Sequence, residues 1–408
     1  MVEETSMVQE RSGGITAPRG FQAAGLHCGV KRAKKDLALV VSDVPAACGA
    51  TFTQNRVPAA PVVVDKEQLL RSSYIRALAV NSGNANACTG DRGMEDAREM
   101  VRVTARAARV HESEVLVSST GVIGQLLPME KIVAGIILSA LRLSKEGGSA
   151  AAEAILTTDT FVKELAVQTT IDGIAVTLGG MAKGSGMIAP NMATMLAFVT
   201  SDAAIAPPLL KTALKKAVDK SFNRITVDGD TSTNDMVVVL ANGLAGNSLL
   251  SSENDIGYDA FCEALEYLLV RLAKMIVVDG EGATKFVEIT VAGAASDADA
   301  AKAAKSIATS NLVKTAIHGE DANWGRVLAA VGNAGIDFKP TETEIFFGSV
   351  PILRKNYQVN FSEEEAKQVL SQKEIDIRVQ LNGGPGVATF WTCDLSKDYV
   401  AINANYRT

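Results

Sequence analysis

The sequence predicts a mixed α/β protein, and three observations lead to that class. Short apolar runs typical of buried strands alternate with longer segments in which apolar residues recur at helical spacing. Two of the runs flank the pair Asp172-Gly173, a dipeptide typical of a tight hairpin turn. The chain contains no internal repeat, heptad pattern or low-complexity tract that would indicate an elongated array. We therefore expect strands and helices to alternate along a layered fold.

The first half of the chain alternates strand and helix signals. The predicted strands, rich in β-branched and aliphatic residues, cover 37–41, 75–81 and 115–118, and the predicted helices cover 94–110 and 129–143. A hairpin then joins strands at 164–169 and 174–179, because Asp172-Gly173 can adopt the positive φ that such a turn requires.

The second half continues the same alternation. Pro207-Pro208 opens a predicted helix that runs to residue 220, because proline fits the first turn of a helix, and a long amphipathic helix is predicted for 260–276. After them we expect a strand at 286–292, a helix at 298–309, and strands at 375–381 and 387–393 that pair with each other. Ser362, with Glu365 three residues later, marks the start of the helix before this pair.

The length and composition describe a folded globular protein of more than one domain. The chain has 408 residues, of which 47% are apolar and 21% charged, whereas one domain holds about 150 residues. We predict a loose N-terminus at 1–14, a catalytic α/β domain at 15–205, a smaller α/β region at 206–282 and a C-terminal α/β domain at 283–408.

The charge pattern excludes several classes of partner. The 40 basic and 46 acidic residues give a net charge of −6, so the surface that nucleic-acid binding requires is not expected. The longest apolar run, 132–141, is shorter than the roughly 20 residues that span a bilayer. The acidic first residues lack the pattern of a secretory signal, which favours a cytoplasmic location.

The cysteines and histidines do not form a metal site by their spacing. The five cysteines are far apart and contain no C-x-x-C pair, so we expect reduced thiols. The three histidines are isolated, so we predict no metal and few candidates for a Ser-His-Asp triad. An acidic cluster of Asp228, Asp230 and Asp235 alternates with Thr and Gly, which favours turn hydrogen bonds over a metal site.

The segment 179–196 is the most unusual in the chain, because glycines gather at one end of it and Lys183 lies among them. A phosphate-binding loop requires G-x-x-x-x-G-K-[ST], but here Lys183 is followed by Gly184, so that motif is absent. One interpretation is an ordinary glycine-rich connection between two strands. The other depends on Thr194, which follows a small residue directly before an apolar run.

A threonine at a new N-terminus would explain how a histidine-poor protein activates a nucleophile. Cleavage between Ala193 and Thr194 would give Thr194 a free α-amine, whose ordinary pKa near 7.7–8.0 suits it to accept the proton of its own hydroxyl. The same hydroxyl could perform the cleavage by attacking the carbonyl of Ala193. The chain would then separate into an α part, 1–193, and a β part, 194–408.

This segment resembles the self-processing threonine of the ornithine acetyltransferase (glutamate N-acetyltransferase) family of arginine biosynthesis. Residues 183–196 read K-G-S-G-M-I-A-P-N-M-A-T-M-L. Further blocks resemble the family in the same order along the chain, at 118–124 (SSTGVIG), 156–160 (LTTDT), 225–235 (ITVDGDTSTND), 279–285 (DGEGATK), 321–326 (DANWGR) and 402–408 (INANYRT). The resemblance covers about residue 15 to the last residue. It implies the layered α/β/β/α sandwich of the self-processing N-terminal-nucleophile aminopeptidase/ornithine acetyltransferase type, with a C-terminal α/β domain.

The resemblance implies a reaction and its catalytic residues. Acetyl would move from N2-acetyl-L-ornithine to Thr194 and then to L-glutamate, in a ping-pong path through an acetyl-enzyme. The family's oxyanion hole falls on Thr120 and Gly121, where a hydroxyl and a backbone N–H could converge.

The resemblance also implies the residues that bind substrate. Lys183 falls on a family binding position and offers a cation for an amino-acid carboxylate, while Glu281 could pair with a cationic group. The remaining family positions, with Thr194 itself, are Thr157, Asn403 and Thr408. Family precedent suggests an α2β2 assembly without a cofactor. The sequence leaves open whether acetyl-CoA is also a donor.

Two other functions remain alternatives. One is an N-terminal-nucleophile amidase or aminopeptidase, in which water takes the acyl group, because a fold alone does not separate the two reactions. The other is an uncleaved, non-catalytic amino-acid-binding relative in which Thr194 stays within the chain. The matches at Lys183, Glu281, Asn403 and Thr408 favour transfer, because a hydrolase needs no second amino-acid acceptor.

Overall fold

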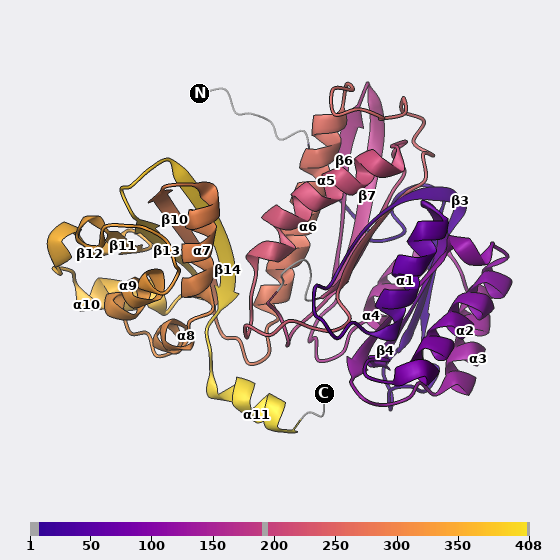
Figure 1. The fold of residues 1–408 in the computed structure, drawn as a ribbon, viewed down its shortest axis with the longest axis horizontal. Coiled ribbons are helices and arrows are strands. Elements are labelled where there is room, and N and C mark those ends of the chain that lie inside the picture. The colour runs from indigo at the N-terminus through magenta and orange to yellow at the C-terminus, as the bar shows by residue number, and fades with distance from the viewer. Residues whose placement is uncertain (1–7, 190–194, 406–408) are drawn as a thin grey trace.

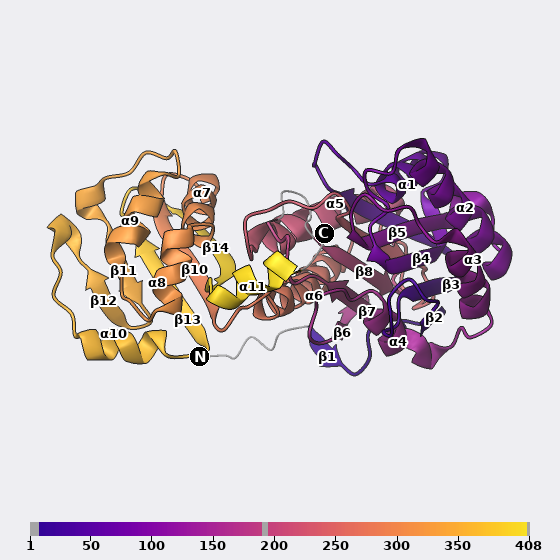
Figure 2. The same ribbon diagram turned by 90° about the horizontal axis from the view of Figure 1, so that it is seen from below.

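The computed structural model describes residues 8–189 and 195–405. These residues form one nine-stranded sheet and one five-stranded sheet, which Figures 1 and 2 show as two bodies joined by extended chain. The C-terminal helix α11 (Lys397–Asn405) lies between the two bodies in both views. Ala193, Thr194 and Thr408, which the sequence analysis singled out, lie outside the described residues.

The larger sheet has the strand order β1-β6-β7-β8-β9-β3-β4-β5, and β2 pairs with β3 outside this path. Its strands are β1 (Gln9–Arg11), β2 (Phe21–Leu26), β3 (Leu37–Phe52), β4 (Tyr74–Asn84), β5 (Val115–Val122), β6 (Lys163–Ile171), β7 (Ile174–Lys183), β8 (Leu196–Ser201) and β9 (Met236–Ala241). The predicted hairpin is confirmed, because Ile171 pairs with Ile174 and both turn residues, Asp172 and Gly173, have positive φ.

The long strand β3 belongs to both halves of this sheet. Its first part pairs with β2 and β4, its last part pairs with β9, and the register shifts between Val41 and Ala46. Successive side chains of a strand point to opposite faces, and here the two faces enter different cores. Phe198 of β8 and Val238 of β9 share a core with Val40 of β3. The two halves of the sheet therefore pack face to face.

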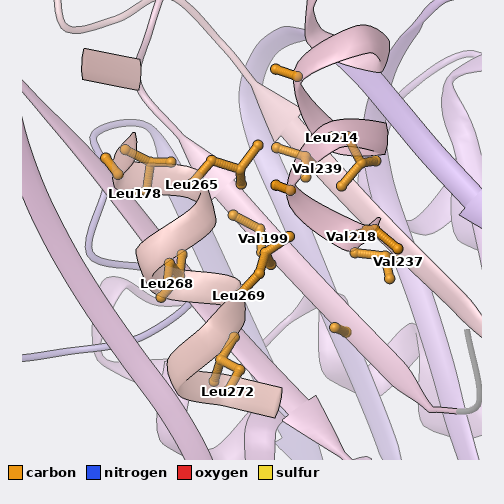
Figure 3. Packing of buried hydrophobic residues seen from close by; sticks show 14 of the residues in the cluster. Leu178, Val199, Leu214, Val218, Val237, Val239, Leu265, Leu268, Leu269 and Leu272 are labelled. Atoms are coloured by element: carbon orange, nitrogen blue, oxygen red, sulfur yellow. The ribbon is translucent and has the colours of Figure 1, made fainter. Parts of the chain in front are cut away.

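Helices cover the two outer faces of this double layer. The outer face of β6–β9 packs against α5 (Pro207–Lys220) and α6 (Tyr258–Val278), and Figure 3 shows Leu265, Leu268 and Leu269 of α6 against Val199. The outer face of β3–β5 packs against α1 (Ala60–Arg71), α2 (Gly90–Ala108) and α3 (Met129–Ala140), while α4 (Gly148–Ala154) closes the inner core. The predicted α/β/β/α sandwich is confirmed.

The smaller sheet has the order β12-β11-β13-β10-β14 and a core of its own. Its strands are β10 (Phe286–Ala294), β11 (Glu344–Phe347), β12 (Val350–Leu353), β13 (Glu374–Gln380) and β14 (Gly386–Cys393), and its helices are α7 (Asp297–Ala308), α8 (Asn311–His318), α9 (Trp324–Gly332) and α10 (Glu363–Leu370). The predicted cap of α10 is confirmed, because the Ser362 side chain accepts the N–H of Glu365. The predicted pairing of 375–381 with 387–393 is wrong, because β10 lies between β13 and β14.

The structure corrects two of the predicted divisions of the chain. Region 206–282 is not a separate unit, because it supplies β9 to the larger sheet and α5 and α6 to its outer layer. Within the predicted loose terminus, Gln9–Arg11 forms the edge strand β1 on β6. No helix within the described ranges is both long and apolar enough to cross a membrane.

The sheet brings several strand ends to one place. Lys183 at the end of β7 pairs with Leu196 at the start of β8, and Leu196 pairs in turn with Met236 at the start of β9. Met236 also lies opposite Phe52 at the end of β3. Residues 184–195 of the unusual segment therefore join β7 to β8 at the end of the sheet where strands distant in sequence converge.

Candidate active site

A pocket of about 240 Å³ lies at these strand ends of the larger sheet. Both the predicted oxyanion residues and the predicted substrate-binding residues line it. It is lined by Thr120, Gly121, Ile123, Thr157, Thr158, Lys183, Gly186, Met187, Ile188, Met195, Leu196, Asp228, Asp230, Ser232, Thr233, Asn234, Asp235, Glu281, Tyr399 and Asn403. The structure thus brings together every predicted site residue that it describes, together with Met195, the residue that follows Thr194.

The predicted oxyanion residues lie at the end of β5. Gly121 has φ 132°, and a Cβ there would come within 2.4 Å of the backbone carbon of Gly83, so only glycine fits this position. The Thr120 hydroxyl oxygen accepts a hydrogen bond from Lys183 Nζ at 3.4 Å. Because the ammonium donates to that oxygen, the hydroxyl proton of Thr120 remains available to a group in the pocket.

Asn234 fixes the end of β5 from the other side of the pocket. Its side-chain amide donates to the carbonyl of Ser119 at 2.7 Å and to that of Ala85 at 2.6 Å. Its amide oxygen accepts from the Thr233 hydroxyl at 2.7 Å. The residue beside Thr120 is therefore held by a buried hydrogen bond, which preorganises the backbone where an oxyanion would need its donors.

Lys183 brings a buried cation to the pocket, with 8% of its surface exposed. Burial alone would raise the pKa of Asp159, but the charges of Lys183 and Lys163 hold that pKa below its usual range. Gly184 N–H donates to Asp159 Oδ1 at 2.7 Å, so the same carboxylate fixes the backbone directly after Lys183. The lysine is thus a positioned, charge-compensated cation.

Asp228 holds the glycine-rich segment in place. Its carboxylate accepts the N–H groups of Met187 at 2.6 Å and Ile188 at 2.8 Å, and that of Asp230 at 3.2 Å. The turn role predicted for Asp228 is therefore confirmed. Burial raises the pKa of this carboxyl against the hydrogen bonds that lower it.

Glu281 and Asn403 close the pocket from the C-terminal side. Asn403, on α11, donates from Nδ2 to Glu281 Oε2 at 2.8 Å. A Cβ on Gly186 would come within 2.4 Å of the Glu281 carboxyl carbon, so a side chain at 186 would displace the Glu281 carboxylate from this position. The other carboxylate oxygen of Glu281, Oε1, has no hydrogen bond within the described residues, so it is available to a ligand.

Sequence reasoning missed Asp235 as a lining residue. Its carboxyl is buried, and Oδ2 has no hydrogen-bond partner in the part of the chain that the structure describes. Burial raises the pKa of this carboxyl well above its usual value. An Asp in a Thr- and Asn-rich turn carries no signal of burial, so only the packing of β9 beside β8 reveals its position.

The comparison with known families decides the family. A sequence profile described as the ArgJ family matches residues 22–408.

The chain belongs to the ArgJ family.

This result confirms the family resemblance drawn from the sequence blocks. The arginine biosynthesis bifunctional protein ArgJ of Symbiobacterium thermophilum is 52% identical over 400 residues, which cover 97% of this chain and 99% of that protein. The protein of the same name from Caldanaerobacter subterraneus is 51% identical over the same shares of the two chains. The relationship to ArgJ proteins therefore extends over both bodies of the fold.

Two solved structures of relatives match part of the chain. The arginine biosynthesis bifunctional protein ArgJ of Bacillus halodurans is 48% identical, with a TM-score of 0.44, over 46% of this chain and 98% of that chain. Ornithine acetyltransferase of Mycobacterium tuberculosis, in complex with ornithine, is 40% identical, with a TM-score of 0.42, over 45% of this chain and 98% of that chain.

Proposed function

We propose that this ArgJ-family chain is a glutamate N-acetyltransferase that moves acetyl from N2-acetyl-L-ornithine to L-glutamate. It first cleaves itself between Ala193 and Thr194, and Thr194 then carries the acetyl group. The observation that carries this proposal is the pocket that gathers Thr120, Lys183 and Glu281 beside Met195. Relatives named for arginine biosynthesis, and a relative solved with ornithine, support the choice of substrates.

In the first half-reaction, the Thr194 hydroxyl attacks the acetyl carbonyl and its α-amine takes the hydroxyl proton. The N–H of Gly121 and the hydroxyl of Thr120 donate to the oxyanion, and Lys183 strengthens the second donor because it donates to the Thr120 oxygen. The bond between the acetyl carbon and the ornithine nitrogen then breaks, and the nitrogen leaves with that proton. In the second half-reaction, the neutral amine of glutamate attacks the acetyl ester. The α-amine of Thr194 takes a proton from that nitrogen and gives it to the threonine oxygen as the ester bond breaks, which restores the free hydroxyl.

Both substrates are amino acids, so the pocket has to bind a carboxylate and, for ornithine, an additional ammonium. Lys183 supplies the buried cation, and Thr157 adds a neutral hydrogen-bonding group on the same wall. Glu281 supplies the anion, oriented by Asn403. We assign the carboxylate to the Lys183 side and the ammonium to the Glu281 side, because charge complementarity orients a ligand that carries both signs.

The proposal includes further statements about this chain. Acetyl-CoA serves as a second donor of acetyl to the same threonine, in line with the word bifunctional in the names of the relatives. Thr408 completes the substrate site, the α and β parts assemble as α2β2, and the enzyme works in the cytoplasm without a cofactor. Native mass measurement tests the assembly, and incubation with acetyl-CoA tests the second donor.

The deciding experiment is the intact mass of the denatured protein, before and after brief exposure to N-acetylornithine without acceptor. We expect two fragments that separate before Thr194, with one acetyl group on the second. T194A should remain uncleaved and inactive, whereas T194S should retain part of both activities. T212A, a threonine substitution on the surface of α5, is the matched control and should behave as the unmodified chain.

The other outcomes would identify the alternatives. Two fragments that release acetate and never retain or transfer acetyl would indicate an amidase. A single unbroken and inactive chain would indicate an amino-acid-binding relative. Full activity in T194A would reject Thr194 as the nucleophile.

A further inference from the structure

Three charged side chains lie buried together beneath the pocket, and the reaction described above uses none of them. Lys163 at the start of β6 is 0% exposed, Asp159 is 3% exposed and Asp279 is 4% exposed. Lys163 Nζ lies 2.7 Å from Asp159 Oδ1 and 2.5 Å from Asp279 Oδ2. We call these three residues the buried triad. The lysine bridges two carboxylates that are distant in sequence.

Asp159 connects the triad to two of the substrate-binding segments. Its Oδ2 accepts the backbone N–H of Thr157 at 2.9 Å. Its Oδ1 accepts the N–H of Gly184, directly after Lys183, at 2.7 Å. The Asp159 carboxylate therefore sets the spacing between Thr157 and Lys183. These are the two residues that we placed on the side of the pocket that binds the substrate carboxylate.

Asp279 connects the triad to the segment that carries Glu281. Its carbonyl accepts from the Ser185 hydroxyl at 2.6 Å, and the Ser185 carbonyl accepts the N–H of Glu281 at 3.0 Å. Its carboxylate also accepts the N–H of Thr160 at 2.9 Å. The segment that carries Glu281 is thus held against the segment that follows Lys183.

Stability alone does not account for this arrangement. A buried ion pair is often no more stable than well-packed apolar residues of similar volume, because each charge loses its hydration. Here the two carboxylates accept backbone N–H groups of segments that line the pocket, and the bridge of Lys163 fixes the distance between them. Compared with apolar packing, the charged groups therefore add hydrogen bonds of fixed direction, which hold these segments in one arrangement.

We propose that Lys163 is a positioning residue for substrate binding. By bridging Asp159 and Asp279, it holds Thr157, Lys183 and Glu281 at the separation that an amino-acid substrate requires. The inference rests on the proposed function, because it assumes that these three residues bind the two amino acids. Lys163 itself does not line the pocket, so it acts through the residues that do.

The test compares a neutral triad with a charge-preserving variant. The variant D159N/K163M/D279N removes all three charges together, so neither Lys163 nor either carboxylate of the triad is left buried without its partner. K163R keeps the bridging cation. K314M changes another buried lysine, in the C-terminal body, and is the matched control. For each protein we would measure self-cleavage, the fraction of chains that N-acetylornithine acetylates, and KM and kcat for both amino acids.

We expect the neutral triad to self-cleave and to raise KM for both N-acetylornithine and glutamate by about 10- to 100-fold, as displacement of binding groups by about 1 Å would cause. The kcat per acetylatable site should change less than KM, because within the described ranges no hydrogen bond joins the triad directly to Thr120 or Gly121, and the link to Thr120 runs only through Lys183. K163R keeps the bridging charge, so its KM values should stay much closer to those of the unmodified chain. K314M should leave both KM and kcat unchanged. A purely structural role would lower the folded fraction and leave KM unchanged in the chains that fold.

Three results would overturn the inference. The first is a neutral triad with unchanged KM for both amino acids. The second is a folded variant that fails only in self-cleavage, which would assign the triad to maturation. The third is a change confined to kcat. If the unmodified chain is not acetylated by N-acetylornithine, the proposed function fails first and this inference fails with it, so the two failures are distinguishable.

Discussion

Two fully buried lysines show different ways of keeping an ammonium inside the protein. Lys163, beneath the pocket, is paired with Asp159 and Asp279. Lys314, on α8 of the C-terminal body, donates instead to the Thr392 hydroxyl at 2.9 Å and to the carbonyl of Cys393. Within the described ranges no carboxylate forms an ion pair with Lys314. Neutral acceptors thus suffice to bury a lysine in this protein.

The comparison indicates what the carboxylates at Lys163 add. Asp159 and Asp279 accept backbone N–H groups of segments on the pocket wall, whereas the acceptors of Lys314 belong to the end of β14. A buried charge cluster marks the place where distant segments must keep a fixed separation. A buried lysine among neutral acceptors marks ordinary packing between a helix and a strand.

The largest effect should follow from removing one carboxylate of the buried triad. D159A leaves Lys163 and Lys183 short of a counter-charge and removes the acceptor of two backbone N–H groups. We expect it to lower the free energy of unfolding by about 3–5 kcal/mol, measured by denaturant unfolding. D43A, at an exposed carboxylate of the same body, is the control. A loss below about 1 kcal/mol would show that the triad is not coupled as its geometry indicates.

A smaller effect should follow from K314M. The substitution keeps the apolar stem and removes hydrogen bonds to the Thr392 hydroxyl and the Cys393 carbonyl. Because these acceptors lose their buried donor, we expect a loss of about 1–3 kcal/mol in the free energy of unfolding. The acetyl-transfer constants kcat and KM should stay unchanged. A rise in KM like that expected for the neutral triad would remove the contrast between the two lysines.

The third prediction concerns Asp235, a buried carboxyl whose Oδ2 has no hydrogen-bond partner in the described part of the chain. Because burial raises the folded-state pKa of Asp235, the folded protein keeps a proton that the unfolded chain releases. The stability from that proton is complete below the unfolded pKa and is lost as pH rises through the raised folded value.

The variant D235N, which does not titrate, should therefore gain stability relative to the unmodified chain as pH rises from about 4 towards neutral and above, by on the order of 1 kcal/mol. Thermal unfolding across this range measures the difference, with D219N, at an exposed carboxylate on α5, as the control. A gain that does not depend on pH would mean that ionisation of Asp235 is not its cause.

The smallest effect should follow from a surface ion pair. Lys302 and Asp299 lie three residues apart on α7, with their charged atoms 3.0 Å apart, and Lys302 is exposed. Water screens such a pair, so K302A should change the free energy of unfolding by less than about 0.5 kcal/mol. Denaturant unfolding of K302A beside K314M compares an exposed with a buried lysine in the same body. A loss as large as that of K314M would contradict the role of burial.

Local structure was predictable wherever a residue acts on its own neighbours. The Asp172-Gly173 turn and the Ser362 cap both follow from the backbone conformation or the hydrogen bond that one residue provides within three positions. The pairing of β13 with β14 was not predictable in this way. The two strands are close in sequence, but β10 lies between them and pairs with both. All three strands contribute apolar residues to the core of the smaller sheet, so their order depends on the packing of that core.

The division of the chain failed for a related reason. Region 206–282 was predicted from two helix signals, and nothing in them shows that β9 inserts between β3 and β8. The position of β9 in the sheet depends on which apolar faces pack together. Periodicity shows which face of an element is apolar, but not which other element packs against it. Asp235, at the entrance to β9, was missed as a pocket residue for the same cause.

The sequence by itself determined the chemistry that this protein carries. It supplied the proposed cleavage junction Ala193-Thr194, the glycine at 121 that admits close backbone approach, and the charged residues Lys183 and Glu281. Only the tertiary structure decided that these groups share one pocket, and that Lys163, beside Asp159, pairs with Asp279, which lies 116 residues from Lys163 along the chain. The physical reason is that turns, caps and periods depend on neighbours along the chain, whereas a site depends on which distant faces pack together.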